Sequence, residues 1–387
     1  MTQALQGLPS RLIQLVPRFR PDMDGVGECA LRLGNALYKA YEIPSDYLVY
    51  HPPAPGSSID LPVPFPHRVE RLTGASASSL NHALDHFLAD SSAPPVLLLH
   101  YVSYGFSPHG TPAWLPPAIE RFHAKGGRVL TLFHELYALA RFPSKTFFTS
   151  WLQRRIFRRL LARSEAAFTA SQEFLDRIQQ NNKTHRPASL IGICSNAGEP
   201  DNPTPLALRK RRLAVFGRFS TRKHLYARNL PQLLRIAQHL GIEEIADIGP
   251  VDEPLWMEKH VYGPAGGLVR GYGAMKDGAI SGLLEDSILG ALAYRYPLRW
   301  KSGVFAAYQA HAMAILLFRF ENEIEPRDPA DWCLSADRLL ALPAGSVDSM
   351  AKMQQAAIAG YEHYQRYRSA HSMAETLLPA LRVAAKR

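Results

Sequence analysis

Two histidines in the sequence stand where strands of a parallel sheet are expected to end. His100 and His134 each follow a short run of apolar residues, and His134 is followed by Glu135. An imidazole can hydrogen-bond a hydroxyl group or move a proton near neutral pH. We therefore take His134 and Glu135 as the candidate catalytic pair, and His100 with Tyr101 as a second candidate contact to substrate. The alternative is that both histidines are structural.

A glycine-rich turn near the N-terminus has the composition of an anion-binding loop. Gly25, Val26 and Gly27 follow the first predicted strand and open a predicted helix. Glycine lets a ligand approach the backbone closely, and the amides at the start of a helix favour negative charge. An ordinary strand-to-helix turn is the alternative. A dinucleotide fingerprint would place glycine at position 30, where the chain has Ala30, so an NAD-dependent oxidoreductase is a less favoured function.

A second glycine turn, in the second half of the chain, is followed by cations. Arg218, Arg222 and Lys223 come shortly after Gly217, which ends the predicted strand Leu213–Phe216. Guanidinium groups can fork onto phosphate oxygens, and an ammonium group adds a point charge. We expect these three side chains to bind a diphosphate, with a solvated basic loop as the alternative.

A third candidate for phosphate binding lies at Lys301, Ser302, Gly303 and Val304. The segment combines an ammonium group, a hydroxyl group and the expected start of a helix. Tyr272, which ends a predicted strand, is added to the candidate ligand-binding residues. A purely structural turn is the alternative at Lys301–Val304.

The segment Trp151–Leu161 predicts an amphipathic helix with a basic face. Arginines at positions 154, 155, 158 and 159 share the segment with apolar residues on the other side. Such a helix suits the surface of an anionic membrane, and an ordinary surface helix is the alternative. Nucleic acid is not favoured as a partner, because aromatic residues do not interleave with the basic ones and no nucleic-acid-binding module is recognised.

Metal sites, disulfides and membrane spans are not expected. Cys29, Cys194 and Cys333 are too few and too far apart for a disulfide framework or a cysteine metal site. His82 and His86 share a helix face but have no third ligand nearby. No apolar run is long enough to cross a membrane, and no export signal is read. We expect a cytoplasmic protein, attached peripherally to the inner face of the plasma membrane through the basic helix.

Short apolar runs alternate with helical patterns along most of the chain, which is typical of parallel sheets covered on both faces. We predict an α/β fold with two Rossmann-like, doubly wound domains facing a cleft. The parts are an N-terminal domain at 1–197, a linker at 198–212, a C-terminal domain at 213–346 and a helical tail at 347–387 that packs back toward the N-terminal domain. Ligands of such sheets bind at the carboxyl ends of the strands.

The composition is that of a folded protein with acidic partners. The chain has 387 residues, of which 47% are hydrophobic and 20% charged, and its formal net charge is +10. These values exclude disorder as the dominant state. The positive charge favours phosphorylated metabolites, anionic lipid or nucleic acid as partners.

The order of these features resembles the GT-B glycosyltransferases, and within them the broad group of family-4-type enzymes. The similarity spans residues from about 11 to 320, and the motifs that carry it are Asp24–Gly27, Phe133–Glu135, Ala170-Ser171 and Val215–Phe219 with the cations that follow. The resemblance implies transfer of a sugar from a nucleotide diphosphate sugar to a glycan or lipid-linked acceptor, without a cofactor or metal. The local sequence around His134 and Lys301 is similar to that of bacterial enzymes of exopolysaccharide and cell-surface glycan synthesis.

The resemblance also assigns roles to the candidate residues. Gly25–Gly27, the cations after Gly217 and the Lys301–Val304 turn would hold the donor diphosphate, His134 would contact the transferred sugar, and His100 with Tyr101 would face the acceptor. The group usually carries two glutamates eight residues apart, and the segment Arg299–Gln309 has none. A catalytically inactive GT-B-like binding protein is therefore the main alternative.

Overall fold

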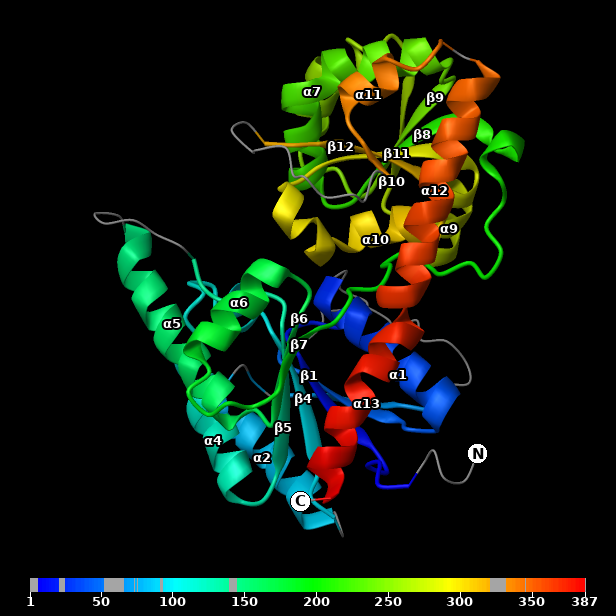
Figure 1. Cartoon of the computed structure of the whole chain (residues 1–387). Helices are drawn as coiled ribbons and strands as arrows, with labels where there is room; N and C mark the ends of the chain where they lie inside the picture. Colours follow the sequence, from blue (N-terminus) through cyan, green and yellow to red (C-terminus); the bar gives the residue numbers. More distant parts are fainter. Residues whose placement is uncertain are drawn as a thin grey trace. The chain divides into compact units, whose positions relative to one another are not determined.

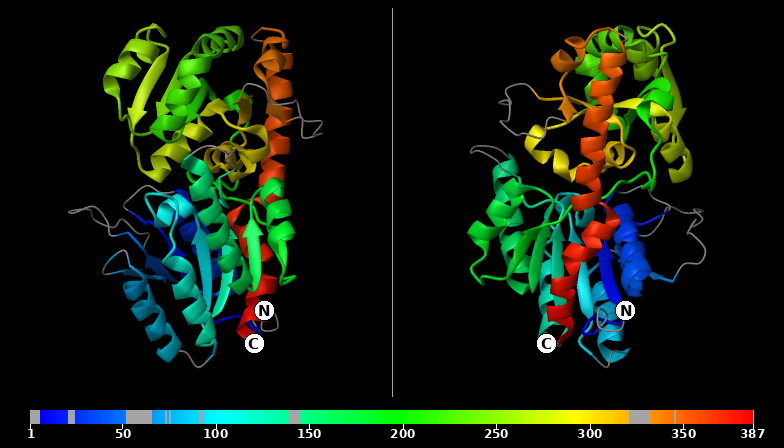
Figure 2. Two further views of the ribbon diagram at one scale, coloured as in Figure 1. Left: turned by 90° about the vertical axis from the view of Figure 1, so that its left-hand side faces the viewer. Right: turned by 45° about the vertical axis from the view of Figure 1, so that its right-hand side comes forward.

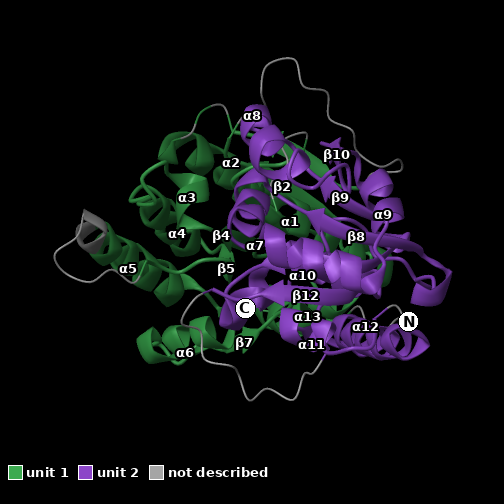
Figure 3. Ribbon diagram, turned by 90° about the horizontal axis from the view of Figure 1, so that it is seen from above, with its two compact units in different colours: residues 1–192, 370–387 green, residues 193–369 purple. Residues whose placement is uncertain are grey.

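The computed structural model describes residues 6–20, 25–51, 66–72, 74, 76–90, 93–138, 145–320, 332–344 and 346–386. The chain divides into two compact units (Figure 3). Unit 1 contains residues 1–192 and 370–387, and unit 2 contains residues 193–369. The chain thus leaves unit 1 once and returns to it for its last helix.

Unit 1 is built on a seven-stranded parallel sheet (Figure 1). The central strands are almost continuously apolar and buried, as expected for a sheet covered on both faces. The strand order reverses between β1 and β4, so their carboxyl ends form the topological switch point where ligands of such sheets bind. In order across the sheet the strands are β3 (Arg68–Arg71), β2 (Ser45–Val49), β1 (Leu12–Val16), β4 (Val96–Tyr101), β5 (Arg128–Phe133), β6 (Ala166–Thr169) and β7 (Ala188–Leu190).

Helices cover both faces of this sheet (Figures 1 and 2). On one face α1 (Gly25–Tyr41) packs against α13 (Ala370–Lys386), and on the other α2 (Ala77–Asp90), α4 (Leu115–Ala124) and α5 (Lys145–Arg163) form a row. Met373, Leu377 and Leu381 fix α13 to unit 1, since all three are fully buried. The short α3 (Ser103–Phe106) follows β4, and α6 (Gln172–Asn181) joins β6 to β7.

Unit 2 repeats the pattern with a six-stranded parallel sheet. Its switch point lies between β8 and β11. Across the sheet the strands are β10 (Val269–Gly273), β9 (Glu244–Ile248), β8 (Lys210–Phe216), β11 (Ser287–Ala293), β12 (Ala314–Phe318) and β13 (Cys333–Leu334). The helices are α7 (Phe219–Leu240), α8 (Pro254–Met257), α9 (Asp277–Glu285), α10 (Gly303–Ala310), α11 (Ala336–Leu340) and α12 (Val347–Tyr367), with short turns η1 (Leu206–Leu208), η2 (Glu258–Tyr262) and η3 (Tyr296–Lys301).

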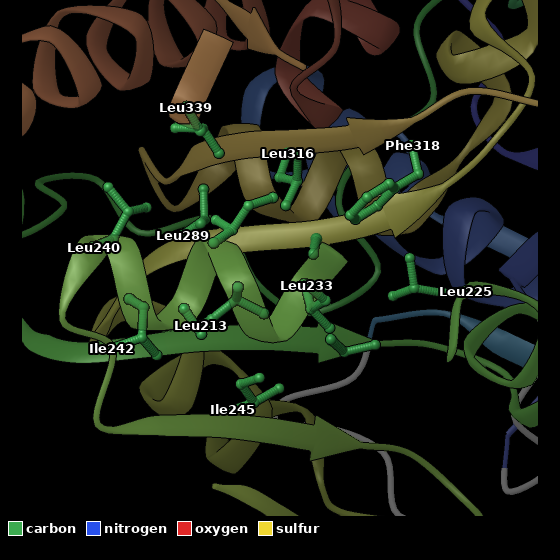
Figure 4. Close-up of a cluster of buried hydrophobic side chains, with 14 of the residues drawn as sticks. Leu213, Leu225, Leu233, Leu240, Ile242, Ile245, Leu289, Leu316, Phe318 and Leu339 are labelled. Atoms are coloured by element: carbon green, nitrogen blue, oxygen red, sulfur yellow. The ribbon is translucent and has the colours of Figure 1, made fainter. Parts of the chain in front are cut away.

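Alternate residues of the unit 2 strands face two separate cores. Leu213, Leu289 and Leu316 pack with α7 and α11 (Figure 4). Their neighbours Ala214 and Ile315 pack with α9 and α10 on the opposite face. Each fully buried leucine contributes roughly 1.5–3 kcal/mol of stability, so the two cores hold the strand ends in fixed positions.

The units are divided at other positions than the sequence predicts. The predicted linker 198–212 overlaps β8, which begins at Lys210, and residues 193–209 belong to unit 2. One reason is that Tyr364 of α12 accepts a hydrogen bond from the backbone amide of Ser195 at 2.8 Å. The predicted tail 347–387 is helical, but its two helices are divided between the units: α12 belongs to unit 2 and α13 to unit 1.

Candidate functional site

A line of polar side chains crosses the interior of the unit 1 sheet at its switch point. It is formed by Ser45 of β2, Gln14 of β1, His100 of β4 and His134, which directly follows β5. The strand registers place each member two residues nearer the carboxyl edge than the member before it. Because side chains alternate along a strand, all four belong to the same face. We call this line the Ser45–His134 chain.

Hydrogen bonds join its members. Gln14 Nε2 donates to Ser45 Oγ at 2.8 Å, and Gln14 Oε1 lies 2.8 Å from His100 Nε2. His100 Nδ1 lies 3.2 Å from His134 Nε2, and the two imidazoles are stacked with centroids 5.5 Å apart. The first three side chains are fully buried, whereas His134 is half-buried at the carboxyl edge. The Ser45–His134 chain therefore connects the sheet interior to its carboxyl edge.

Helix α1 can lie close over the Ser45–His134 chain because position 34 is glycine. A Cβ atom at Gly34 would come within 2.0 Å of Tyr47 Oη, 2.9 Å of Ser45 Oγ and 3.1 Å of Gln14 Nε2. Real Cβ atoms do not approach other atoms so closely. The small residue thus permits the packing that removes these polar groups from water.

His100 and Tyr101 do not have the exposure that their predicted role as acceptor contacts requires. Both side chains are fully buried. Burial, and to a lesser degree the neighbouring His134, lowers the pKa of His100 well below its usual value, so the ring is neutral. Burial and then Glu135 raise the pKa of Tyr101. The half-buried His134 and Glu135 remain as candidates at this edge.

The N-terminal glycine turn has two different glycines. Gly27 is buried, and a Cβ atom there would lie 2.3 Å from the carbonyl oxygen of Arg18, so this glycine serves the close approach of two backbone segments. Gly25 is exposed, with no atom of the described residues within 4 Å of a Cβ position, and Val26 is half-buried. Asp24 lies outside the described residues.

In unit 2, the cations after Gly217 belong to a helix rather than a loop. Gly217 has φ +129°, a conformation that other residues rarely adopt. Arg218 follows as the N-cap of α7 and is exposed, and α7 begins at Phe219. Helical spacing then decides which of the following side chains point outward.

Arg222 points into the unit, where it has a structural role, and its side chain also contributes to the lining of a hollow described below. Its side chain is 1% exposed, and its guanidinium group forms a buried ion pair with Asp247 of β9. Its Nε also donates to the carbonyl oxygen of Gly217 at 2.9 Å, and Tyr226 Oη donates to the same Asp247 at 2.9 Å. Arg222 therefore holds the glycine turn in place from inside.

Lys223 and Tyr272 both have carboxylate partners. The ammonium group of Lys223 lies 2.6 Å from both carboxylate oxygens of Glu253 and 4.9 Å from the ring of Trp256. Tyr272 Oη donates to Glu244 at 2.8 Å, and burial followed by this contact raises the tyrosine pKa. Glu244 is the first residue of β9, so the Tyr272 hydroxyl lies toward the amino end of the sheet. This position disagrees with the predicted donor contact of Tyr272.

Two helices of unit 2 begin at one hollow. Arg218 caps α7, and Ser302 caps α10, with Ser302 Oγ accepting from the amide of Phe305 at 3.1 Å. Lys301 ends the turn before this cap, and Gly303 is the first residue of α10. The hollow has a volume of about 40 Å³, room for one small group, and lies at the switch point between β8 and β11. Its lining includes Phe216, Thr221, Arg222, Ala293, Tyr294, Ser302 and Val304.

Thr221 and Tyr294 are not among the residues predicted from the sequence. Thr221 follows Arg218 within the first turn of α7, where the prediction reads a loop. Tyr294 directly follows β11, a strand that the prediction misses. Recognition of Ser287–Ala293 as a strand would have pointed to Tyr294, because residues after parallel strands lie at the binding edge.

Two buried arginines hold the turn that leads into α10. Arg368, at the end of α12, donates to Gln309 Oε1 and to the carbonyl oxygen of Trp300, both at 2.7 Å. Burial lowers the pKa of Arg368 to about 10. Arg299 donates to the carbonyl oxygen of Tyr296 at 2.7 Å and lies over the Tyr296 ring. These hydrogen bonds from buried side chains thus fix the backbone at the start of α10.

Helix α5 carries the predicted basic face, but its apolar side is in the core. Phe157 is fully buried, as are its apolar neighbours on the same side, while Trp151 is 61% exposed. Arg154, Arg155 and Arg158 are exposed beside it. An open hollow of about 530 Å³ follows this surface. We call its lining the α5 arginine face: Glu120, Trp151, Arg154, Arg155, Arg158, Arg159, Ala162 and Arg163.

Within the described ranges, no three His, Cys, Asp or Glu residues gather in a way that could hold a metal ion. His82 and His86 of α2 pack edge to face, with centroids 4.5 Å apart. No helix in the described part of the chain combines the length and the apolar character needed to cross a bilayer.

No protein-family model matches the sequence, and no curated protein matches it. Solved structures match nearly the whole chain. Sucrose-phosphate synthase from Thermosynechococcus elongatus aligns with a TM-score of 0.64 at 12% identity, covering 96% of this chain and 98% of that one. A glycosyltransferase from Rickettsia africae aligns with a TM-score of 0.59 at 11% identity, covering 97% and 99%.

An E. coli structure described as trehalose-6-phosphate with bound UDP-2-fluoro glucose aligns with a TM-score of 0.57 at 12% identity, covering 96% of this chain and 99% of that one. These neighbours share the two parallel sheets and their alternating helices. The chain has the GT-B fold. At these identities the GT-B fold describes the architecture, and the reaction has to be argued from the residues.

Proposed function

We propose that this chain is a glycosyltransferase that moves a sugar from a nucleotide diphosphate sugar to a hydroxyl group of a glycan or glycolipid. The observation that carries the proposal is the unit 2 hollow at which α7 and α10 both begin. The first amides of a helix lack partners within the helix, and the helix dipole makes that end positive. Two such ends near one hollow suit the negative charge of a phosphate group, and the hollow has room for one small group of the donor. The bound UDP-2-fluoro glucose in an E. coli structure of the same fold supports this choice of ligand.

Sugar transfer from a nucleotide diphosphate sugar requires stabilisation of the leaving group, the nucleoside diphosphate. As the acceptor oxygen bonds to the anomeric carbon, the bond from that carbon to the diphosphate breaks. The acceptor hydroxyl releases its proton to water, and the departing diphosphate carries the negative charge on its oxygens. We assign Arg218, Lys223 and Lys301 to that charge, together with the amide of Gly303. His134, with Glu135 beside it, is assigned to the transferred sugar. The proposal includes no metal ion and no redox cofactor.

Thermal stabilisation by donor nucleotides tests the proposal. Melting temperature is measured while UDP, GDP and their sugars are titrated into the protein. A ligand at 100 times its dissociation constant stabilises the folded state by about 2.7 kcal/mol, which raises the melting temperature by several degrees. If no nucleotide diphosphate at millimolar concentration raises the melting temperature, the proposal is wrong.

Variants locate the diphosphate. We expect Arg218→Ala and Lys223→Ala each to weaken donor binding by roughly tenfold or more, because a hydrogen bond to a charged group contributes about 1.5–3 kcal/mol. Arg235→Ala is the matched control, since Arg235 is an exposed cation further along the same helix. Equal affinities in all three variants would remove α7 from the site.

A binding protein without activity is the second candidate, and one observation favours it. The segment Arg299–Gln309 has no glutamate, and in the folded protein Ala307 and Tyr308 are fully buried. Tyr308 Oη donates to main-chain oxygens of β8 and β11 and accepts from the amide of Phe216. Neither side chain is available to a ligand. Turnover of a radiolabelled donor with a lipid acceptor extract separates an enzyme from a protein that only binds.

The α5 arginine face is our proposal for attachment to the cytoplasmic side of a plasma membrane, where exopolysaccharide or cell-surface glycan acceptors are made. Because Phe157 and its neighbours are in the core, the attachment is electrostatic, with Trp151 as the exposed aromatic side chain. Each basic residue near an anionic bilayer contributes about 1 kcal/mol.

Co-sedimentation with vesicles tests the attachment. Arg155→Glu combined with Arg158→Glu should weaken binding to anionic phosphatidylglycerol vesicles by about 30-fold or more, and neutral vesicles should not bind. The same charge change made at Arg235 and Lys259, two exposed cations of unit 2, is the control. Equal loss in both variants, or equal binding to duplex DNA, would contradict a membrane face.

A further inference from the structure

The Ser45–His134 chain is an unusual use of buried strand positions. Gln14 and His100 are the polar members of the apolar strands β1 and β4, and both are fully buried. An apolar side chain at either position would need no hydrogen bond, whereas a buried polar group costs free energy unless it is paired. Here each polar group is paired with the next one, and the line ends at the candidate residue His134.

The direction of each hydrogen bond follows from the partners. Gln14 Nε2 donates to Ser45, so its Oε1 faces His100 and can only accept. His100 must therefore carry its proton on Nε2. Burial keeps this imidazole neutral, so its Nδ1 has a lone pair and no proton. That lone pair faces His134 Nε2 at 3.2 Å, and His134 must be the donor.

We propose that Gln14 and His100 are positioning residues that hold His134 in the tautomer with the proton on Nε2. In the neutral ring the other nitrogen, Nδ1, then carries no proton. The inference deepens the proposed function and rests on it for its consequence: a fixed tautomer of His134 at the carboxyl edge presents the same ring to the sugar substrate in every turnover. The tautomer itself does not depend on that function.

Substitutions of Gln14 separate positioning from folding. Gln14→Met has a similar length but removes the acceptor for His100 Nε2–H. A buried N–H without an acceptor is unfavourable, so His100 should move its proton to Nδ1, donate to His134 Nε2 and reverse the tautomer of His134. Gln14→Glu keeps an acceptor toward His100 and should retain the wild-type tautomers. Gln153→Met is the matched control, because Gln153 is also buried in unit 1. Its hydrogen bonds are to Ala138 and Gly110, which are not members of the Ser45–His134 chain.

Long-range ¹H–¹⁵N spectra of the full-length protein, labelled at histidine, report the tautomers directly. We expect His100 and neutral His134 to be protonated on Nε2 in the wild type, in Gln14→Glu and in Gln153→Met, and on Nδ1 in Gln14→Met. A wild-type spectrum with His134 protonated on Nδ1 overturns the proposal even if Gln14→Met fails to fold. An unchanged spectrum in a folded Gln14→Met protein overturns it as well.

Steady-state kinetics test the consequence. With a donor identified by the titrations above, Gln14→Met should lower kcat by tenfold or more with little change in the KM for donor, and Gln14→Glu should restore most of the rate. Equal rates in Gln14→Met and wild type would show that the tautomer has no role in transfer. If no donor is turned over by the wild type, the proposed function fails while the spectra still decide the tautomer.

Discussion

At the scale of single residues, the environment of each cation decides its role more than its charge does. Arg222 and Lys223 are neighbours in the sequence and equally basic, yet one forms a buried ion pair and the other lies at the surface beside Glu253. Their different positions follow from the 100° step between successive residues of a helix. The guanidinium group of Arg222 is thus committed to Asp247 although its side chain lines the unit 2 hollow, whereas the ammonium group of Lys223 is at the surface.

The first prediction concerns Arg222. Arg222→Ala should lower the free energy of unfolding by about 3–5 kcal/mol, because it leaves the Asp247 carboxylate buried without its cation. Urea unfolding measures the loss. Arg235→Ala, an exposed change on the same helix, should stay within about 0.5 kcal/mol of wild type. Similar stabilities in the two variants would mean that the ion pair is not formed.

The second prediction compares two glycines of one turn. Gly27→Ala should destabilise the protein by about 1–3 kcal/mol, because its Cβ atom would collide with the carbonyl oxygen of Arg18. Gly25→Ala should be neutral or slightly stabilising, since no atom of the described residues lies within 4 Å of the new methyl group and alanine favours helix. Chemical unfolding measures the stability of both variants. If Gly25→Ala lowers the free energy of unfolding more than Gly27→Ala does, the prediction is wrong.

At the scale of elements, apolar strands are predictable from the sequence and small-residue strands are not. The predicted runs at 128–133 and 314–318 coincide with β5 and β12. The central strand β11 is missed because Gly290 and Ala291 give it little strand character. Gly290 is nevertheless required there, since a Cβ atom would lie 2.6 Å from the ring of Tyr308. The packing partner that explains the glycine is distant in the sequence.

The start of α7 shows the same limit for the site. Pro231 is read from the sequence as the first turn of a helix, but α7 begins at Phe219 and Pro231 lies inside it, on the exposed side. The helix therefore contains the segment read as a phosphate-binding loop, which is why Arg222 points inward. The positions of Ser302 as N-cap and Gly303 as first residue of α10 agree with the sequence, because a hydroxyl followed by glycine and small residues is a local signal for a helix start.

The joint between α1, β2 and the segment before β3 depends on a neutral histidine. His67 Nδ1 accepts from the amide of Ser45 at 2.9 Å, and its Nε2 lies 2.9 Å from Asn35 Oδ1. Burial, and then the nearby Arg11, lowers the pKa of His67 to about 4. In the unfolded chain the pKa is about 6.5. Below pH 6.5 the unfolded state binds a proton that the folded state does not.

The third prediction follows from this difference in proton binding between the unfolded and the folded state. The contribution of His67 is complete above pH 6.5 and is lost as the pH falls toward 4. Between pH 7 and 5, wild type should lose about 1 kcal/mol more unfolding free energy than His67→Gln, half of the roughly 2 kcal/mol that full shielding would give. His109→Gln, an exposed histidine, should follow the wild-type curve. If the free energy of unfolding of wild type and of His67→Gln changes with pH in parallel, His67 is not held neutral in the folded protein.

At the scale of the whole molecule, the units differ in continuity. Unit 2 is one stretch of chain, whereas unit 1 needs its last helix from the far end of the sequence. Met373, Leu377 and Leu381 of that helix are fully buried, and α13 packs on α1, β4 and β5. Unit 1 without α13 would expose this apolar surface to water.

The fourth prediction tests this continuity with fragments. Residues 193–369 expressed alone should unfold cooperatively, and residues 1–192 alone should be degraded quickly by protease. Addition of a peptide with residues 370–387 should slow the degradation of the second fragment, because it covers the exposed apolar face. Equal protease resistance of 1–192 with and without the peptide would show that α13 is dispensable for unit 1.

The late position of α13 has a consequence for synthesis on the ribosome. Domains generally fold in the order in which they emerge, with the N-terminal one first. Here the strands of unit 1 are translated first, but α13, which covers them, is translated only after all of unit 2. A nascent chain that has completed unit 2 still lacks α13, so during that interval the apolar surface that α13 covers is exposed and can aggregate.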